Sequence, residues 1–293
     1  MPNKKIIITG GAGFVGTNLI KFLLNKTKYK IISIDNYSSG SKKNHVKNSR
    51  VKYFKGDTVN IFKLIKKPKE IKTIFHFGEF ARIYQSFLKM NECIASNSIG
   101  SNAIFNFCLK NKIKLIYSAT SATLGNKGDD KNLSPYAFSK AKNLELLENL
   151  KKWFNFKYEI IYFYNVYGPH QICRGQMSTV IGIFEDHYKR KKPLPVVKPG
   201  SQTRRFTHID DTIQVCYLAW KKNLNRHYSV TNKKSYSILE VAKMFKSKLK
   251  FLPKRAGERY ASALIKRNLS NKVYQNYGKI NLKNYIYNFI NNN

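Results

Sequence analysis

The stretch Thr9-Gly10-Gly11-Ala12-Gly13-Phe14-Val15-Gly16 follows the short apolar run Ile6-Ile7-Ile8 and decides the expected fold. A β-branched run that ends in glycines and leads into apolar residues at helical spacing predicts a strand, a tight turn and a helix. In such a turn Gly10 permits the sharp bend, Gly13 lets the backbone approach a pyrophosphate, and Gly16 lets the helix pack close to the sheet. Amides and the positive dipole at the helix N-terminus favour phosphate. The stretch therefore predicts a dinucleotide-binding βαβ unit.

An acidic residue stands where the second expected strand ends. Asp35 follows Gly16 by 19 residues, near the spacing at which dinucleotide-binding folds place a carboxylate against the adenosine ribose. A carboxylate there accepts hydrogen bonds from the ribose and repels a 2′-phosphate, so the sequence favours NAD over NADP. Two alternatives stay open: Asp35 simply starts a turn before Asn36, or the nearby Lys42 and Lys43 accommodate NADP.

Apolar runs alternate with helical patterns through the N-terminal half. Strands are expected at residues 31–34, 51–54, 73–77, 114–118 and 159–164, and helices at residues 14–24, 58–67, 91–110 and 136–150. Such alternation is typical of the α/β class and predicts a doubly wound parallel sheet. Asp57 follows the third strand, where its side chain either meets the adenine edge or belongs to an ordinary Gly-Asp turn.

The pattern loosens after residue 165. Lys192–Gly200 is rich in proline and is predicted as a loop. Short strands are expected at residues 207–209 and 227–231, and helices at residues 237–245 and 285–290. Ser237, with Glu240 three residues later, has the pattern of a capping box at a helix start.

These changes divide the chain into two expected parts. A Rossmann domain that binds NAD takes residues 1–165 and about 207–232. A smaller C-terminal substrate-binding lobe takes residues of about 166–206 and 233–293. The expected fold class is therefore α/β, with a doubly wound parallel Rossmann sheet and this lobe beside it.

Composition excludes several classes of protein. The chain has 293 residues, of which 42% are hydrophobic, so it is not a disordered chain. No apolar run approaches the roughly 18 residues of a membrane span, and the first residues lack the pattern of a signal peptide. The four cysteines are Cys93, Cys108, Cys173 and Cys216. Their wide spacing favours reduced thiols in a cytoplasmic protein over a disulfide framework or a metal site.

The charge balance is strongly basic. Lys and Arg number 54 against 16 Asp and Glu, which gives a formal net charge of +38. A polyanionic partner is one interpretation. An AT-rich genome is another, because Lys, Asn, Ile, Phe and Tyr all have AT-rich codons, and the lysines are spread along the whole chain. In either case a basic field attracts small substrates that carry phosphate.

The stretch Tyr136-Ala137-Phe138-Ser139-Lys140 supplies the chemistry expected beside a nicotinamide. Residues four apart on a helix share one face, and a lysine ammonium beside a phenol favours the phenolate. A tyrosinate can take the proton of a substrate hydroxyl while hydride leaves the same carbon. Such Tyr/Lys pairs also arise by chance in a chain this rich in both residues. The position after the fifth expected strand, in a chain with the glycine turn, favours the functional interpretation.

Together these motifs resemble the extended short-chain dehydrogenase/reductase family, in its branch of NAD-dependent nucleotide-sugar epimerases and dehydratases, and most of all the UDP-glucose 4-epimerases. The matching landmarks are Thr9–Gly16, Asp35-Asn36, Gly56-Asp57, His76-Phe77-Gly78, Asn97 with Gly100, Thr120 through Gly125, Ser134-Pro135-Tyr136 with Lys140, Asn165 through Pro169, Gly200 through Arg204, Asp210-Asp211, and Arg255 with Gly257-Glu258. This order is specific to the superfamily and less specific to the substrate.

The resemblance implies a role for each matching residue. Thr120, with Ser121 as an adjacent spare, would hydrogen-bond the reacting hydroxyl. Tyr136 would act as the base, and Lys140 would assist it and bind the nicotinamide ribose. The residues expected to bind NAD are Gly10, Gly13, Phe14, Val15, Gly16, Asp35, Asn36, Asp57, Thr58, Phe77, Gly78, Tyr136 and Lys140.

The resemblance also implies a substrate site and an assembly. Asn165 would meet the diphosphate of a nucleotide-sugar substrate. Arg204 and Arg255 would clamp phosphates or the nucleotide, a task that suits arginine, unless they are ordinary surface charges. Family members commonly dimerise through a four-helix bundle, which the helices at 91–110 and 136–150 would supply here. A homodimer is therefore expected.

Two departures from the family pattern narrow the expected reaction. Dehydratases and decarboxylases of this branch carry an acidic residue just after the catalytic threonine, where this chain has Ser121 and Ala122. The sequence therefore favours C4 epimerisation of a UDP-glucose or UDP-galactose type of sugar, by oxidation to a 4-keto sugar and reduction from the other face. The second departure is Glu79, where the 4-epimerases usually have alanine. A salt bridge to Arg82 or a contact with substrate is expected for it.

Three other functions stay open. Arg174-Gly175-Gln176-Met177 resembles a Lys-Gly-Ser-Met segment of ADP-glycero-manno-heptose 6-epimerases, although an arginine is a poor base. A nucleotide-sugar reductase with net cofactor turnover would keep the same residues. A nucleic-acid-binding or regulatory protein on a Rossmann scaffold has only the net charge in its favour, since fold alone does not fix function.

Overall fold

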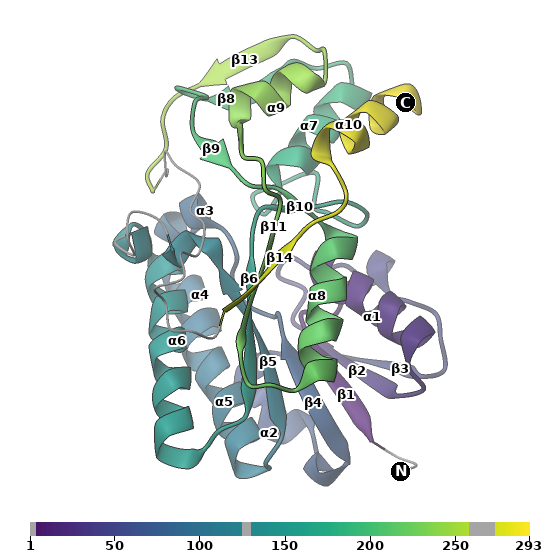
Figure 1. Ribbon diagram of the computed structural model, residues 1–293, viewed down its shortest axis with the longest axis vertical. Helices are drawn as coiled ribbons and strands as arrows, with labels where there is room; N and C mark the ends of the chain where they lie inside the picture. Colours follow the sequence, from purple (N-terminus) through teal and green to yellow (C-terminus); the bar gives the residue numbers. More distant parts are fainter. Residues whose placement is uncertain (1–3, 125–129, 258–272) are drawn as a thin grey trace.

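The computed structural model describes residues 4–124, 130–257 and 273–293. Its largest element is a parallel sheet with the strand order β14-β11-β6-β5-β4-β1-β2-β3 (Figure 1). The strands are β1 (Lys5–Thr9), β2 (Lys30–Asp35), β3 (Val51–Lys55), β4 (Ile71–His76), β5 (Lys114–Thr120), β6 (Tyr158–Phe163), β11 (His227–Thr231) and β14 (Val273–Tyr277). The predicted doubly wound parallel sheet is confirmed.

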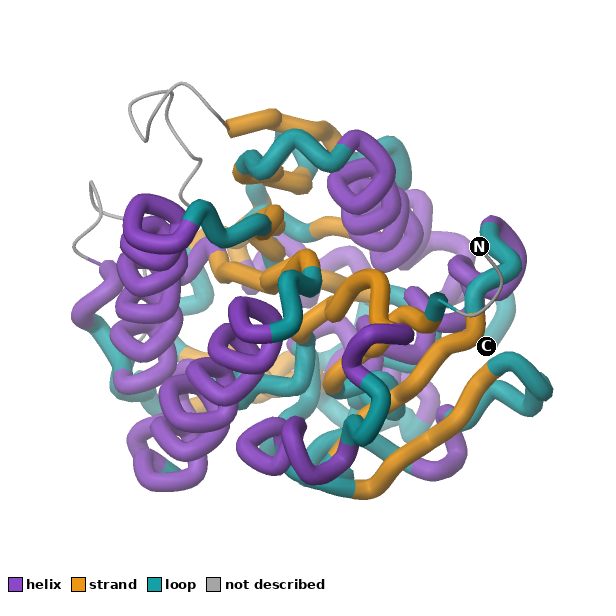
Figure 2. The backbone as a smooth tube through the Cα atoms, turned by 90° about the horizontal axis from the view of Figure 1, so that it is seen from below, coloured by secondary structure: helices purple, strands orange, loops and turns teal. Residues whose placement is uncertain are grey.

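Helices cover both faces of this sheet, so that the strands form a band between them (Figure 2). The helices are α1 (Phe14–Lys26), α2 (Ile61–Leu64), α3 (Ile83–Leu88), α4 (Met90–Ile94), α5 (Ser101–Lys110), α6 (Pro135–Phe154), α7 (Val180–Lys189), α8 (Ile209–Lys222), α9 (Ile238–Met244) and α10 (Leu282–Asn291). On one face α1 and α8 bury Leu23 and Ile213 in one apolar cluster. On the other face α5 and α6 bury Ile104 and Leu147 in a second cluster. Burial of these stripes is what fixes each helix against the sheet.

A third apolar cluster lies beyond the carboxyl ends of the strands, under α7, α9 and α10 (Figure 1). Short strands accompany these helices and pair as β7 (Val166–Tyr167) with β10 (Thr207–His208), β9 (Thr203–Arg204) with β12 (Tyr236–Ser237), and β8 (Leu194–Val197) with β13 (Leu249–Leu252). Phe184, Phe245 and Ile286 are buried in this cluster. The cluster gives this part of the chain its own core.

Three predicted elements differ in the structure. The segment Lys192–Gly200 is not all loop, because Leu194 and Val196 are buried in the third cluster and β8 pairs with β13. The strand expected at 207–209 is short and pairs with β7 rather than with the large sheet. Residues 273–277, which the sequence analysis assigns to the lobe, form the edge strand β14 of the large sheet. In each case packing between distant segments decides the outcome.

Two predicted helices are interrupted. Residues 58–67 form a 3₁₀ turn at Thr58–Asn60 followed by one turn of α-helix, α2. Between α4 and α5 the chain makes a π-helical turn at Ala95–Gly100. Asn97 in this turn is buried, and its amide donates to Phe80 O at 3.0 Å and to Ser139 Oγ at 3.2 Å. Such π turns are frequent at functional sites.

One further expectation is met directly. The predicted capping box is present at α9, where Ser237 and Glu240 satisfy each other's backbone amides. None of the helices in the described ranges has the length and apolar character that crossing a bilayer requires.

Candidate active site

The carboxyl ends of the parallel strands surround a cavity of about 410 Å³. The cavity lies where β1 and β4 are neighbours and the strand order reverses, which is where open α/β sheets bind ligands. The predicted residues that line it are Gly10, Gly13, Phe14, Val15, Gly16, Asp35, Asn36, Asp57, Thr58, Phe77, Gly78, Thr120, Tyr136, Lys140 and Asn165. The fold thus brings the predicted cofactor and catalytic residues into one cavity.

The turn between β1 and α1 has room only for glycine at two of its positions. Gly10 has a φ of +68°, and a Cβ there would lie 2.9 Å from Gly78 Cα. A Cβ on Gly16 would lie 2.6 Å from Gly11 Cα. Both contacts are with backbone, which cannot move aside without reshaping the turn. The glycines therefore keep this loop close to the sheet and its amides available at the start of α1.

Gly16→Ala is expected to weaken NAD binding at least about tenfold. The new methyl group would push against the backbone of Gly10 and Gly11 and displace the amides that receive the pyrophosphate. Isothermal titration with NAD measures the effect. Lys21→Ala, an exposed position on the same helix, should bind as the unaltered protein does. Equal affinity in Gly16→Ala and the unaltered protein would contradict this function of the turn.

Asp35 lies at the end of β2 with its carboxylate held by the backbone. It accepts hydrogen bonds from Ala12 N at 2.9 Å and from Tyr37 N at 2.8 Å. Burial raises the pKa of Asp35, and the two backbone hydrogen bonds lower it. Next to it, Asn36 Nδ2 donates to Asp57 Oδ1 at 2.6 Å. These groups form the acidic end of the cavity, where the adenosine of a dinucleotide is expected.

Asp35→Ala is expected to weaken NAD binding more than NADP binding, because it removes both a ribose acceptor and the repulsion of a 2′-phosphate. We expect the dissociation constant for NADP divided by that for NAD to fall by at least about tenfold. Titration of the variant with each cofactor measures that ratio. Equal losses for NAD and NADP would show that the carboxylate does not face the ribose.

Helix α6 begins so as to place Tyr136 in its first turn. Ser134 Oγ accepts from Ala137 N at 3.1 Å, and Pro135 takes the first helical position, as is typical of helix starts. Tyr136 N donates to Ser86 Oγ at 3.2 Å. Thr120 closes β5, and its Oγ1 accepts from Ala122 N at 3.1 Å. These hydrogen bonds fix the backbone of Tyr136 and the side chain of Thr120.

Lys140 follows one turn later on α6 and is 3% exposed. It donates to Ser118 O at 2.6 Å and forms an ion pair with Glu79. Burial lowers the pKa of Lys140, and Glu79 raises it. The expected Glu79–Arg82 salt bridge is therefore wrong, because the carboxylate turns toward α6.

The Arg82 side chain instead contacts the segment that precedes α7. Its Nε and Nη2 donate to Met177 O at 2.9 and 2.6 Å. Burial lowers the pKa of Arg82, and Tyr136 raises it, so the guanidinium lies in the neighbourhood of the tyrosine. Both Arg82 and Met177 line the cavity. Sequence reasoning did not assign either to the site. The only signals were the departure at Glu79, three residues before Arg82, and the resemblance of the Arg174–Met177 segment to the heptose 6-epimerases.

The predicted substrate residues are only partly brought together. Asn165 lines the cavity, and its amide donates to Arg205 O at 3.0 Å. Among the described residues around the cavity, neither Arg204 nor Arg255 takes part. Arg255 is exposed and stands 5.3 Å from the ring centre of Tyr84.

Two residues of the family pattern and Arg174 are not in the cavity wall that the structure describes. Gly125 and Glu258 lie outside the described residues. Arg174, the first residue of the segment that resembles the heptose 6-epimerases, is mainly exposed and bonds Asp186 Oδ1 at 2.5 Å. It is not among the described residues that line the cavity.

Comparison with known proteins decides the family. Residues 6–231 match the NAD dependent epimerase/dehydratase family. The chain belongs to this family. It is 29% identical over 259 residues to ADP-L-glycero-D-manno-heptose-6-epimerase of Brachyspira hyodysenteriae, which covers 82% of this chain and 80% of that protein.

Two solved structures share the fold of this family member. The UDP-glucose 4-epimerase of Thermotoga maritima with UDP-glucose superposes with a TM-score of 0.82 at 21% identity, covering 98% of this chain and 97% of that one. The dTDP-glucose 4,6-dehydratase of Streptomyces venezuelae, solved with NAD, gives a TM-score of 0.85 at 18% identity, covering 98% and 96%.

NAD is the cofactor of the family, and the residues here fit it. The turn at Gly10 and Gly16 has no space for a Cβ, as a backbone that approaches a pyrophosphate requires. Asp35, Tyr136 and Lys140 line the same cavity. These residues are compatible with a dinucleotide in this cavity.

Proposed function

We propose that this protein is an NAD-dependent epimerase of a nucleotide-diphosphate sugar, acting at C4 of a UDP-glucose or UDP-galactose type of substrate through a transient 4-keto sugar. The observation that carries the proposal is the meeting of Thr120, Tyr136 and Lys140 in one cavity with the NAD-binding turn. The residues after Thr120 are Ser121 and Ala122, so no carboxylate stands where a dehydratase of this branch would have one.

Each of the three residues has a task that its surroundings support. Tyr136 takes the proton of the sugar hydroxyl and returns it after the sugar has turned. Because Thr120 Oγ1 already accepts from Ala122 N, its own hydrogen is left to donate to the sugar oxygen. Lys140 supplies a positive charge that favours the phenolate. The turn at Gly10 and Gly16 and the carboxylate of Asp35 would hold NAD, which when bound would supply reversible hydride chemistry at the sugar carbon.

The acidic residues of the described cavity wall are otherwise engaged. Asp35 and Asp57 belong to the adenosine end. Glu79 is tied to Lys140 and to other donors. None of the three is in the position after Thr120 from which an acid would drive loss of water. This distribution supports epimerisation over dehydration.

The proposal also assigns roles to the two parts of the chain and to two arginines, and it includes a homodimer. Residues 1–165 with about 207–232 bind NAD, and β14 completes their sheet. The lobe at about 166–206 and 233–293 binds the sugar nucleotide together with Asn165, the last residue of the first NAD-binding segment. Arg204 and Arg255 would contact the substrate only if its nucleotide extends beyond the described residues that line the cavity. A homodimer would cover exposed apolar side chains of the helices at 91–110 and 136–150, such as Ile99 and Phe138.

A second candidate is a heptose 6-epimerase, which the likeness to the Brachyspira hyodysenteriae enzyme favours. Against it stands the exposed position of Arg174, which bonds Asp186 rather than facing the cavity. The same residues Thr120, Tyr136 and Lys140 would serve, so the two candidates differ in substrate and not in the proton acceptor.

Proton NMR of the purified protein with NAD and one nucleotide sugar at a time tests the proposal. UDP-glucose, UDP-galactose and their N-acetyl forms are supplied separately, and the anomeric region is followed. We expect signals of the C4 epimer, reached from both directions, with no change of mass. Loss of water from the product would show a dehydratase instead. Silence from all four sugars in a sample that binds NAD would overturn the C4 proposal, and turnover of the ADP-heptose pair would then identify the second candidate.

A further inference from the structure

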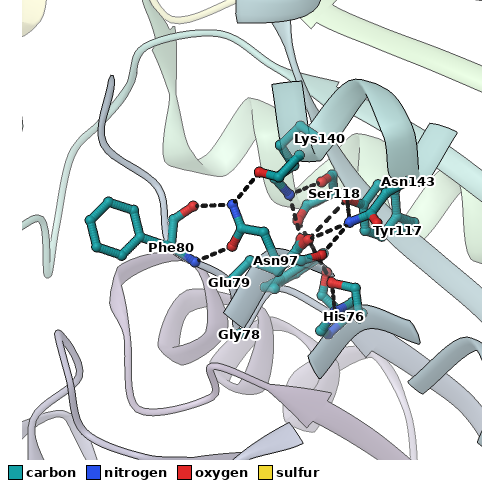
Figure 3. Close-up of polar contacts among 12 residues, drawn as sticks. His76, Gly78, Glu79, Phe80, Asn97, Tyr117, Ser118, Lys140 and Asn143 are labelled. Carbon is teal, nitrogen blue, oxygen red and sulfur yellow. Dashed lines mark hydrogen bonds and ion pairs between the residues drawn. The ribbon is translucent and has the colours of Figure 1, made fainter. Parts of the chain in front are cut away.

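Glu79, three residues after the end of β4, buries its carboxylate beside Lys140 (Figure 3). Its side chain is 2% exposed. Oε1 accepts from Ser101 Oγ at 2.8 Å and from Tyr117 Oη at 2.9 Å. Oε2 faces the Lys140 ammonium. These donors and the ammonium hold the buried carboxylate in one position.

The Lys140 ammonium faces this carboxylate in a buried ion pair. The amine is buried, which lowers the pKa of Lys140, and Glu79 is the carboxylate that raises it. Ser118 O accepts a hydrogen bond from Nζ, and the ring centre of Tyr117 lies 4.7 Å from it. Both are neutral and can orient the ammonium without compensating its charge. A buried amine that loses its counter-ion tends to lose its proton as well.

The carboxylate is in turn fixed by a chain of neutral groups that reaches the glycine turn. Because Ser101 donates to Glu79, its oxygen accepts from His76 Nε2 at 2.9 Å. His76 Nδ1 then accepts from Thr9 Oγ1 at 2.7 Å. Burial lowers the pKa of His76 to about 4, so this ring is neutral near pH 7. Thr9 Oγ1 also accepts from Gly78 N at 3.0 Å.

We propose that Glu79 is a positioning residue for the proposed reaction: its buried carboxylate holds the Lys140 ammonium charged and in place beside Tyr136. This inference rests on the proposed function. Glu79 stands where the sequence departs from the 4-epimerase pattern, and the proposal gives this residue a role. Without the carboxylate, the ammonium that favours the Tyr136 phenolate would be lost.

Other ionisable groups face this pair from every neighbouring element. They are His76 on β4, Cys93 on α4, Tyr117 on β5 and Tyr136 on α6 itself, with Arg82 near the tyrosine. Burial raises the pKa of Cys93 to about 11 and that of Tyr117 well above its usual value. Both are therefore neutral where the enzyme would work. Glu79 and Lys140 are the groups of this set whose charges compensate each other.

The test is the pH profile of kcat/KM for Glu79→Gln, measured with the nucleotide sugar that the unaltered protein epimerises. We expect the acidic limb of the profile to move to higher pH by about one unit or more. At pH values below that limb, kcat/KM should be about tenfold lower than in the unaltered protein. The rate should approach that of the unaltered protein at alkaline pH. A merely structural role would lower the rate equally at every pH. A downward shift would mean that Lys140 keeps its proton unaided and that Glu79 only repels the phenolate, which also overturns the proposal.

Glu159→Gln is the matched control. Glu159 is fully buried and pairs with Lys114 at 2.5 Å, in the same sheet but outside the cavity lining. Its loss should lower stability without moving the pH profile. If Glu79→Gln does not fold, Ser101→Ala and Tyr117→Phe keep the carboxylate and each remove one of its donors. Both should then shift the same limb upward by a smaller amount, and an unmoved limb in both would refute the proposal.

An activity-independent readout separates this inference from the proposed function. The protein is labelled with lysine carrying ¹³C at Cε, and the Lys140 signal is assigned by its absence in Lys140→Arg. In Glu79→Gln this signal should titrate at lower pH than in the unaltered protein. That shift without turnover of any sugar would leave Glu79 its role and reject the epimerase. Turnover with an unmoved Lys140 titration would reject the role of Glu79 alone.

Discussion

Tyr136→Phe is expected to lower kcat by about 10³-fold while leaving the fold intact. The change removes the oxygen that we propose takes the substrate proton. It keeps the ring, which is 8% exposed and packs in an apolar cluster with Phe80 and Ala137. NAD binding should change little, because the glycine turn and Asp35 are untouched. The measurement is turnover of the nucleotide sugar beside titration with NAD and thermal unfolding of the same sample.

The neighbouring tyrosine serves as control for this substitution. Tyr84 lies on α3, and its ring stands under Arg255. It is not among the described residues of the cavity wall. Tyr84→Phe should therefore turn over at a near-normal rate. A purified Tyr136→Phe protein with a near-normal rate would remove Tyr136 from the chemistry and, with it, the main argument for the enzyme class.

Lys140→Met is expected to abolish activity and also to lower the free energy of unfolding, by about 3–5 kcal/mol. The side chains of Lys140 and Glu79 are only 4% and 2% exposed, so removal of the amine leaves a buried carboxylate with no counter-charge. Methionine keeps much of the apolar stem, and the loss is therefore mainly electrostatic. Urea unfolding at neutral pH measures it. The loss should shrink at acidic pH, where the unpaired carboxylate can take up a proton.

The double variant Lys140→Met/Glu79→Gln separates stability from activity. With the charge removed on both sides, we expect most of the lost stability to return. Activity should stay absent, because no ammonium remains to favour the Tyr136 phenolate. Recovery of turnover in the double variant would contradict the role of Lys140. An unchanged free energy of unfolding in Lys140→Met would show that the Glu79 carboxylate does not need Lys140 as its counter-charge.

Much of the cofactor site follows from the sequence. The glycine turn, Asp35 and the Tyr136–Lys140 spacing are local patterns, each set by a few consecutive residues or one helical turn. Parallel strands place their carboxyl ends at one edge of a sheet, so residues that follow successive strands converge without further information. For this reason the cavity is lined by the residues that the sequence singled out for NAD and for proton transfer.

The tertiary structure alone decided the partners of the charged side chains. Glu79 meets Lys140 across 61 residues, and Arg82 meets Met177 across 95. Arg204 and Arg255 match the family in sequence but are not among the described cavity residues. Local periodicity sets which face of a strand or helix a residue occupies. It does not set which distant segment packs on that face, because that choice depends on burial and charge compensation summed over the whole fold.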